Sequence, residues 1–332
     1  MTSSSIITLT HTFSLPVATV RNVFDPKAVI KKYDRLPHDR DNESLKGTYE
    51  RMLERGPERF QVKPHGIPAM DALYSTLPNF KAVLDDIKRN IALTQDSTDG
   101  LKITPMLLLG DPGIGKTHFA KKVAELLGTG MTLVPMSSMT AGWLLSGSSS
   151  QWRGAKPGKI FEAVVEGQYA NPVIVVDEID KASGAAQYDP LGSLYSLLEH
   201  DTAKNFTDEF AEVAVDASQV IWITTANDAR SIPEPILNRM NVFEIESPTK
   251  EEVRLIAQNL YKDICDEHSW GIRFAPELTT ATLDRLTEMK PREIRRALMT
   301  GLGNARLSSR YEILPQDIEE SRGKKSSMGF MQ

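Results

Sequence analysis

The chain has 332 residues, a formal net charge of −5, 40% hydrophobic residues and 25% charged residues. This composition is typical of a soluble globular protein with one large domain or two to three smaller ones, and its acidity disfavours indiscriminate DNA binding. The single cysteine, Cys265, excludes an internal disulfide. No apolar run approaches the roughly 20 residues that a transmembrane helix needs. Since the N-terminus lacks the basic start of a secretion signal, we expect a cytoplasmic protein.

Residues 1–80 are the least informative part of the sequence. Charged residues are dense between positions 39 and 59, where Gly56 and Pro57 interrupt any regular element. This region is expected to be either a small docking domain or an arm wrapped on its neighbours, and the arm is slightly favoured. After it, apolar positions from Leu84 onward predict a short helix.

A glycine-rich segment between a predicted strand and a predicted helix is the strongest motif. Residues 110–117 fit the phosphate-loop pattern G-x-x-x-x-G-K-[ST], in which backbone N–H groups and a helix N-terminus bind nucleotide phosphates. The lysine would reach the β- and γ-phosphates, and the threonine would bind Mg²⁺. The predicted nucleotide-binding residues are Gly110, Asp111, Pro112, Gly113, Ile114, Gly115, Lys116, Thr117, His118 and Asp177.

A second motif lies some sixty residues further along the chain. The apolar run 173–176 predicts a strand buried on both faces, and it ends in Asp177 and Glu178. Such a strand delivers both carboxylates to the carboxyl edge of a parallel sheet, where open α/β sheets bind ligands. We expect Thr117 and Asp177 to hold Mg²⁺, and Glu178 to polarise the attacking water. Together the two motifs predict ATP binding and hydrolysis.

The order of predicted elements indicates an α/β fold followed by helices. The strands are expected at 105–109, 131–135, 173–177, 219–224 and 242–245, alternating with helices around a parallel sheet. A capping box at 249–252 opens a helical region, with further helices at 276–289 and 291–308 and another from Pro315. The predicted domains are an N-terminal region (1–80), the α/β domain (81–247), a small all-helical lid domain (248–322) and a flexible tail (323–332).

Several longer blocks of sequence carry a family resemblance. They are GDPGIGKT (110–117), GAKPGKIFEAV (154–164), NPVIVVDEIDK (171–181), DPLGSLYSLLEHD (189–201) and TTANDARSIPEPILNRMNVFEI (224–245). In this order the blocks resemble the AAA+ ATPases and, within them, the ATPase module of the Lon proteases. The resemblance runs from about residue 81 to residue 323. It implies a P-loop AAA+ parallel-sheet domain followed by a small helical lid.

The resemblance also implies roles for three further residues. Asn227 matches the first sensor, which orients the attacking water; from the residues alone it is a turn asparagine. Arg239 matches the arginine finger that reaches the nucleotide of the next subunit and stabilises transition-state charge. Arg292 matches the second sensor in the lid, and Arg295 and Arg296 are alternatives for that role.

Two stretches match the loops that line the central pore of the family. Trp152 and Arg153 fall in the first, where an aromatic side chain would grip an extended polypeptide; core packing is the alternative for Trp152. Tyr188 is the corresponding residue of the second loop. Arg153 departs from the apolar residue usual beside the aromatic, which hints at an acidic or polar client.

The function implied is a ring-forming, hexameric, Mg²⁺-dependent ATPase that remodels, unfolds or translocates proteins. The stretch after residue 320 is too short for the protease domain of Lon, so a separate peptidase or effector is expected as a partner. Because the sequence has no long apolar run, no membrane partner is expected. The alternatives are a nucleic-acid-linked AAA+ ATPase, such as a loader or a mobile-element regulator, and a nucleotide-gated scaffold. A GTPase is disfavoured, because no Asn-Lys-x-Asp stretch is present.

Overall fold

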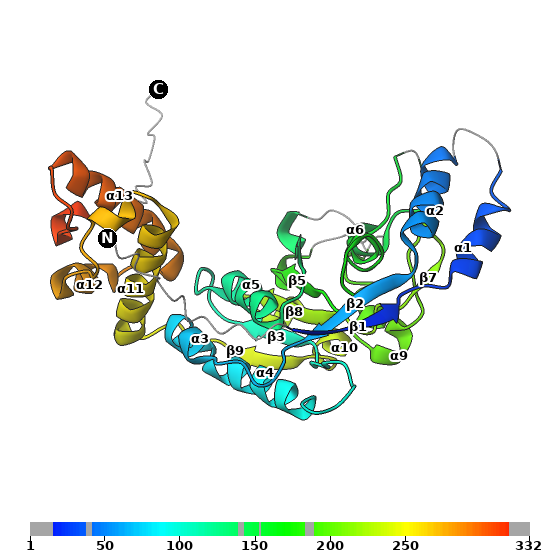
Figure 1. Cartoon of the computed structure of the whole chain (residues 1–332), viewed down its shortest axis with the longest axis horizontal. Helices are drawn as coiled ribbons and strands as arrows, with labels where there is room; N and C mark the ends of the chain where they lie inside the picture. Colours follow the sequence, from blue (N-terminus) through cyan, green and yellow to red (C-terminus); the bar gives the residue numbers. More distant parts are fainter. Residues whose placement is uncertain (1–15, 38–41, 139–142, 153, 183–188, 319–332) are drawn as a thin grey trace, which may run out of the picture. The chain divides into compact units, whose positions relative to one another are not determined.

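The computed structural model describes residues 16–37, 42–138, 143–152, 154–182 and 189–318. They divide into two compact units (Figure 1). The first unit lies within Met1–Met70, Ala82–Leu109 and Thr117–Glu244, and the second within Asp71–Lys81, Gly110–Lys116 and Ile245–Gln332. None of the helices in these described ranges has the length and apolarity that crossing a bilayer requires.

A five-stranded parallel sheet forms the centre of the first unit, which confirms the predicted α/β fold. Four of the strands begin and end within one residue of their predicted bounds, whereas the strand predicted at 219–224 is shifted by two residues. In spatial order the strands are β4 (Met131–Pro135), β5 (Val173–Asp177), β8 (Ile221–Ala226), β3 (Met106–Leu109) and β9 (Asn241–Glu244). Strand β8 therefore lies between the strand that precedes the phosphate loop and the strand that carries the two acids.

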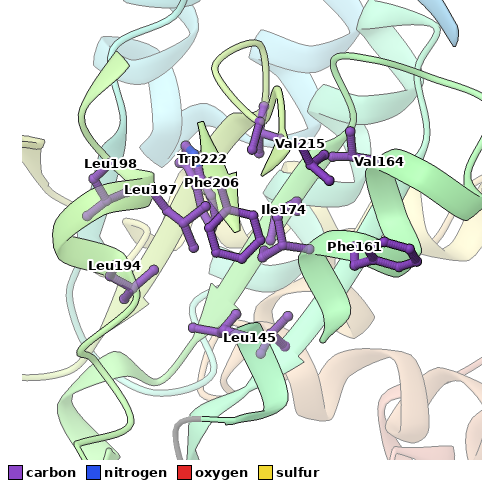
Figure 2. Close-up of a cluster of buried hydrophobic side chains, with 14 of the residues drawn as sticks. Leu145, Phe161, Val164, Ile174, Leu194, Leu197, Leu198, Phe206, Val215 and Trp222 are labelled. Carbon is purple, nitrogen blue, oxygen red and sulfur yellow. The ribbon is translucent and has the colours of Figure 1, made fainter. Parts of the chain in front are cut away.

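Strands β5 and β8, in the interior of the sheet, are buried because both faces of the sheet are covered. All four residues of the β5 run 173–176 are 0% exposed, as expected for a strand of a doubly covered parallel sheet. Figure 2 shows Ile174 of β5 and Trp222 of β8 in one apolar cluster with Phe161 and Phe206. This packing fixes the strands whose ends carry the candidate site.

Short helices and a hairpin surround the sheet. Helix α5, the helix predicted after the glycine-rich segment, begins at Lys116 and buries Phe119 and Val123 in the core. The other elements are α4 (Lys81–Leu93), α6 (Trp143–Ser146), α7 (Lys159–Phe161), the π-helical turn η3 (Glu162–Glu166), α8 (Leu194–Leu197), α9 (His200–Ala203), α10 (Glu234–Leu237) and the hairpin β6 (Phe206–Thr207) and β7 (Ala214–Val215); α5 itself spans Lys116–Leu127.

The N-terminal region shares the core of the first unit. Strand β1 (Val17–Asn22) pairs antiparallel with β2 (Glu58–Lys63), and between them lie α1 (Pro26–Tyr33) and α2 (Glu43–Arg55). Tyr49 and Met52 of α2 are buried in the same apolar cluster as the sheet residues. The Tyr49 hydroxyl donates a hydrogen bond to the Ala211 carbonyl at 2.8 Å. The described residues of this region are thus packed against the sheet domain by apolar side chains that the density of charged residues in the sequence had concealed.

The second unit is mainly helical, as predicted for the lid. Its helices are α3 (Asp71–Thr76), α11 (Lys250–Glu267), α12 (Thr280–Leu286) and α13 (Pro291–Leu307), followed by the 3₁₀ turn η8 (Pro315–Asp317). The predicted capping box is present, since Thr249 and Glu252 exchange side-chain and backbone hydrogen bonds at the start of α11. Cys265, on α11, forms no disulfide and is partly buried.

Candidate nucleotide site

The phosphate loop has the backbone shape that its glycines permit. Gly113 and Gly115 have φ values of 87° and 102°, which side-chain-bearing residues rarely adopt. A Cβ atom on Gly110 would lie 2.3 Å from the carbonyl oxygen of Ile245. Lys116 is 7% exposed, and its ammonium donates to the carbonyls of Gly110 and Asp111, the latter at 3.0 Å. Glycine is therefore required for both torsion and space, and the lysine lies over the loop.

Thr117 and Asp177, the two predicted Mg²⁺ ligands, are brought together. The Thr117 hydroxyl donates to Asp177 Oδ1 at 2.9 Å. The hydroxyl of Thr225, on β8, donates to the same oxygen at 2.7 Å. This places a hydroxyl and a carboxylate within reach of one small cation, and both are oxygen ligands of the kind that Mg²⁺ prefers.

Glu178 has an unusual backbone conformation. Its φ and ψ are 55° and 50°, in the left-handed region where non-glycine residues are uncommon and where active-site residues concentrate. Its N–H donates to the Thr225 hydroxyl at 2.9 Å. Thr225 therefore connects the two acids: it donates to the side chain of Asp177 and accepts from the backbone of Glu178. Sequence analysis missed Thr225, because a threonine in a strand carries no chemical signature.

Asn227 follows β8 directly. Strands β5 and β8 pair in parallel, with Val176 opposite Thr224, so the residues after each strand start from the same edge of the sheet. Asn227 is partly buried there. The next residue, Asp228, accepts hydrogen bonds from the backbone and guanidinium of Arg230, which hold the pKa of that carboxyl at about 2.

Arg239, the predicted arginine finger, follows α10. Its Nη1 donates to the Pro235 carbonyl at 2.6 Å, and its Nε lies 3.2 Å from Glu199 Oε2. The second contact is an ion pair by distance only, because Nε makes no hydrogen bond within the described part of the chain. The side chain is 31% exposed. Its guanidinium is thus held by one backbone carbonyl and one acid.

The lid arginines differ in their surroundings. Arg292 lies at the start of α13, and a Cβ atom on Gly113 of the phosphate loop would approach its Cδ to 2.8 Å. Arg295, one turn further, forms an ion pair with Glu267 of α11. Of these two arginines, therefore, the one against the phosphate loop is Arg292. Arg296 is exposed on the same helix.

Trp152, the predicted pore residue, is 49% exposed and packs edge to face against Trp143, whose ring centroid is 5.6 Å away. Trp143 is 43% exposed, and sequence analysis missed it. The only signal was a second tryptophan nine positions earlier, since 152 − 143 = 9. Arg153 and Tyr188 lie outside the described residues.

A buried carboxylate holds the base of the Trp152 loop. Asp208, after β6, is 0% exposed and accepts hydrogen bonds from the N–H groups of Gly158, Phe210 and Ala211 at 2.8, 2.9 and 3.0 Å. A Cβ atom on Gly147, at the other end of the loop, would lie 2.6 Å from Asp208 Oδ1. Burial raises the pKa of Asp208 to about 6, against the lowering effect of the three N–H donors.

Known proteins resemble the chain over the region that contains the sheet. Residues 106–248 match the family described as "ATPase family associated with various cellular activities (AAA)". Proteins named Lon protease are similar in sequence. That of Halothermothrix orenii is 34% identical over 189 residues, covering 56% of this chain and 24% of the relative. That of Helicobacter pylori is 27% identical over 307 residues, covering 88% of this chain and 34% of the relative. The chain thus spans about a quarter of the length of the first relative and about a third of that of the second.

Solved structures support the fold. A chain in a complex of S. cerevisiae Hsp104 with casein superposes with a TM-score of 0.58 at 18% identity, over 84% of this chain and 51% of that one. A mutant of Thermotoga maritima RuvB superposes with a TM-score of 0.50 at 15% identity, over 77% of this chain and 70% of that one. The chain therefore carries an ATPase domain of the AAA family, and over that domain it is related to the Lon proteases.

Proposed function

We propose that the protein hydrolyses ATP with Mg²⁺ and uses the energy to remodel, unfold or translocate polypeptides in a ring of identical subunits. One observation carries the hydrolytic part: Thr117 and Thr225 both donate to Asp177, and Thr225 also accepts the N–H of Glu178. A merely solvated pair of acids at a strand end would need neither a shared threonine nor a left-handed glutamate.

In this proposal each residue of the site has a distinct role. The glycine loop and Lys116 bind the phosphates, and Thr117 and Asp177 offer oxygen ligands to the metal. The bound Mg²⁺ would neutralise phosphate charge. Glu178 and Asn227 orient the attacking water, while Arg292 contacts the γ-phosphate. Among the described residues no cluster of three or more acidic, histidine or cysteine side chains forms a metal cage, which fits an ion completed by phosphate and water oxygens.

The polypeptide part of the proposal is supported by the exposed loop that carries Trp152. An aromatic side chain on such a loop can grip an extended chain through apolar contact without reading its sequence. The relatives named Lon protease and the Hsp104 complex with casein also favour a protein client. A hexameric ring, a separate peptidase or effector and action in the cytoplasm belong to the same proposal.

Replacing Glu178 with Gln tests the proposal. The variant should bind ATP with unchanged affinity and hydrolyse it about 10²- to 10⁴-fold more slowly, the usual contribution of a general base. With ATP present it should retain unfolded proteins in a pull-down. Glu125→Gln, on the exposed face of α5, is the matched control and should hydrolyse ATP normally. Unimpaired hydrolysis by Glu178→Gln would refute the assigned role, and enrichment of DNA in place of protein would refute the client class.

A further inference from the structure

A hollow lies beside the two exposed tryptophans of the first unit. Its volume is about 590 Å³, and Trp143 and Trp152 line one side of it. Residues from the loop before α8, from α9 and from the β6–β7 hairpin line the rest, among them Ser193, Thr202 and Asn205. The tryptophan rings are perpendicular, at 88°, and each is more than 40% exposed. The hollow thus joins an aromatic wall to a polar one.

The charged residues in the described lining of this hollow are both acidic. Asp189 and Glu209 line it, both are exposed, and no lysine or arginine is found among its described lining residues. The carboxylates of both acids accept hydrogen bonds. Asp189 Oδ1 accepts the N–H of Leu191 at 2.9 Å, and Glu209 Oε1 accepts the Ser146 hydroxyl at 3.4 Å. Side chains fixed in this way lose little rotamer freedom when a partner binds.

We infer that this hollow is a subsite for a lysine or arginine side chain of an extended client polypeptide. An aromatic face attracts a cation and packs against its methylene stem, and the carboxylates of Asp189 and Glu209 pair with its charged head. A glutamate in the same place would face two like charges, and a leucine would offer neither carboxylate a positive charge. The inference rests on the proposed function, and it gives the polypeptide grip a preference for basic side chains in place of the acidic or polar client expected from Arg153 in the sequence.

The preference can be measured without turnover. The probes are labelled, unstructured Gly/Ser peptides that carry spaced lysines, glutamates or leucines, titrated into the full chain with a non-hydrolysable ATP analogue. The lysine peptide should bind about tenfold more tightly than either twin, the ratio that corresponds to 1.4 kcal/mol. Equal binding of the three peptides, no binding, or a preference for glutamate would overturn the inference.

Two sets of variants locate the preference. Trp143→Leu should remove most of it, and so should the double change Asp189→Asn and Glu209→Gln, which keeps side-chain shape and oxygen acceptors. Trp270→Leu and Asp201→Asn are matched controls, because each alters an exposed residue of the same type outside the hollow. They should bind all three peptides as the wild type does. A preference that survives both test variants would place the cation elsewhere and overturn the inference.

The outcome is separable from that of the proposed function. If the wild-type protein does not unfold clients in the presence of ATP, the remodelling proposal is refuted, whichever peptide binds more tightly. Selective binding of the lysine peptide would still establish the subsite, and its absence would leave the hydrolytic network at Asp177 untouched.

Discussion

The hydroxyl of Thr225 does two things at once in the candidate site. It donates its proton to Asp177 and accepts the N–H of Glu178, so one buried side chain sets both the orientation of the carboxylate and the start of the left-handed turn. Buried polar groups that lose a partner cost about 1–3 kcal/mol each. The position of Glu178 relative to Asp177 therefore depends on a residue that touches neither nucleotide nor water in our proposal.

Replacing Thr225 with Val should separate binding from hydrolysis. Valine has a similar shape but supplies neither hydrogen bond, so we expect ATP hydrolysis to fall about 10- to 100-fold, as loss of up to about 3 kcal/mol implies. Affinity for ATP should change little, because the phosphate loop is unaltered. Thr224→Val is the matched control, since that buried hydroxyl bonds to Met106 and Met240 and not to the acids. Equal losses of activity in both variants would contradict a positioning role.

For single residues, the sequence predicts the chemistry where that chemistry depends on a contiguous motif. The loop 110–117 and the acids 177–178 are such motifs, and their residue types indicate phosphate and metal binding. Thr225 acts through Asp177, which lies far away in the chain, and a single sequence holds no record of such a contact. Trp143 lies close to Trp152 in the sequence, but that spacing alone does not indicate that the two rings pack together.

Among the structural elements, the β6–β7 hairpin supports the loop that carries Trp152. The Asp208 carboxylate accepts the N–H of Gly158 at one end of that loop and lies against Gly147 at the other end. Its pKa is raised to about 6 by burial. Because the native state binds this proton more tightly than the unfolded chain, the contribution of Asp208 to the free energy of unfolding becomes more favourable as pH falls from 7 toward 4.

Replacing Asp208 with Asn should remove that pH dependence. Relative to the variant, the wild type should gain about 1 kcal/mol of unfolding free energy between pH 7 and pH 5. Chemical denaturation at the two pH values measures this difference. Asn also replaces one acceptor oxygen by an NH₂ group, so the variant should release the bond to Gly158 and weaken client binding. A constant difference between the two proteins across this pH range would contradict the raised pKa.

Helix α13 offers a comparison between two arginines one turn apart. Arg292 lies against Gly113, whereas Arg295 pairs with Glu267. We expect Arg292→Ala to slow hydrolysis about 10-fold or more, since a hydrogen bond to a charged group contributes about 1.5–3 kcal/mol. Arg295→Ala should change only stability, by less than about 1 kcal/mol, as is usual for an exposed ion pair. Steady-state ATPase assays distinguish the two, and the reverse result would assign the sensor to Arg295.

The fold was predictable from periodicity except where distant residues decide. Buried strands such as β5 have continuous apolar runs, and the capping box marked the start of α11. The predicted bounds of β8 were wrong by two residues. Gln219 resembles the first strand residue, yet its side chain accepts a hydrogen bond from Gln61, far away in the chain, and the strand begins after it. The fold of the N-terminal region could not be predicted because it also depends on distant residues: β1 and β2 pair across about forty residues.

For the molecule as a whole, the proposed ring depends on where Arg239 acts. In our proposal its guanidinium leaves Glu199 and Pro235 to reach the nucleotide of an adjacent subunit. Arg239→Ala should then bind ATP normally but lose about 10³-fold or more in hydrolysis, the range of arginine fingers. Lys116→Ala should also lose ATP hydrolysis, but because its phosphate loop no longer binds ATP normally.

Mixing these two inactive proteins makes the test specific. A subunit with Arg239→Ala keeps an intact phosphate loop, and a neighbour with Lys116→Ala still supplies the arginine, so mixed rings should recover a measurable part of wild-type ATPase activity. Two further preparations, each holding only one of the variants, are the controls. No recovery on mixing, despite co-assembly by size, would place the arginine in the same subunit as the nucleotide it serves.

The N-terminal strand pair has a mechanical consequence. Phe60 of β2 exchanges backbone hydrogen bonds with Gln168 and Ala170, just ahead of the acid-bearing strand, and Val23 accepts the N–H of Asp216 at 2.7 Å, just past the β6–β7 hairpin. The strand pair is thus hydrogen-bonded both to the segment just before β5 and to the segment just after the β6–β7 hairpin. A displacement of β1 and β2 would therefore be transmitted to the strand that carries the acids and to the hairpin that supports the Trp152 loop.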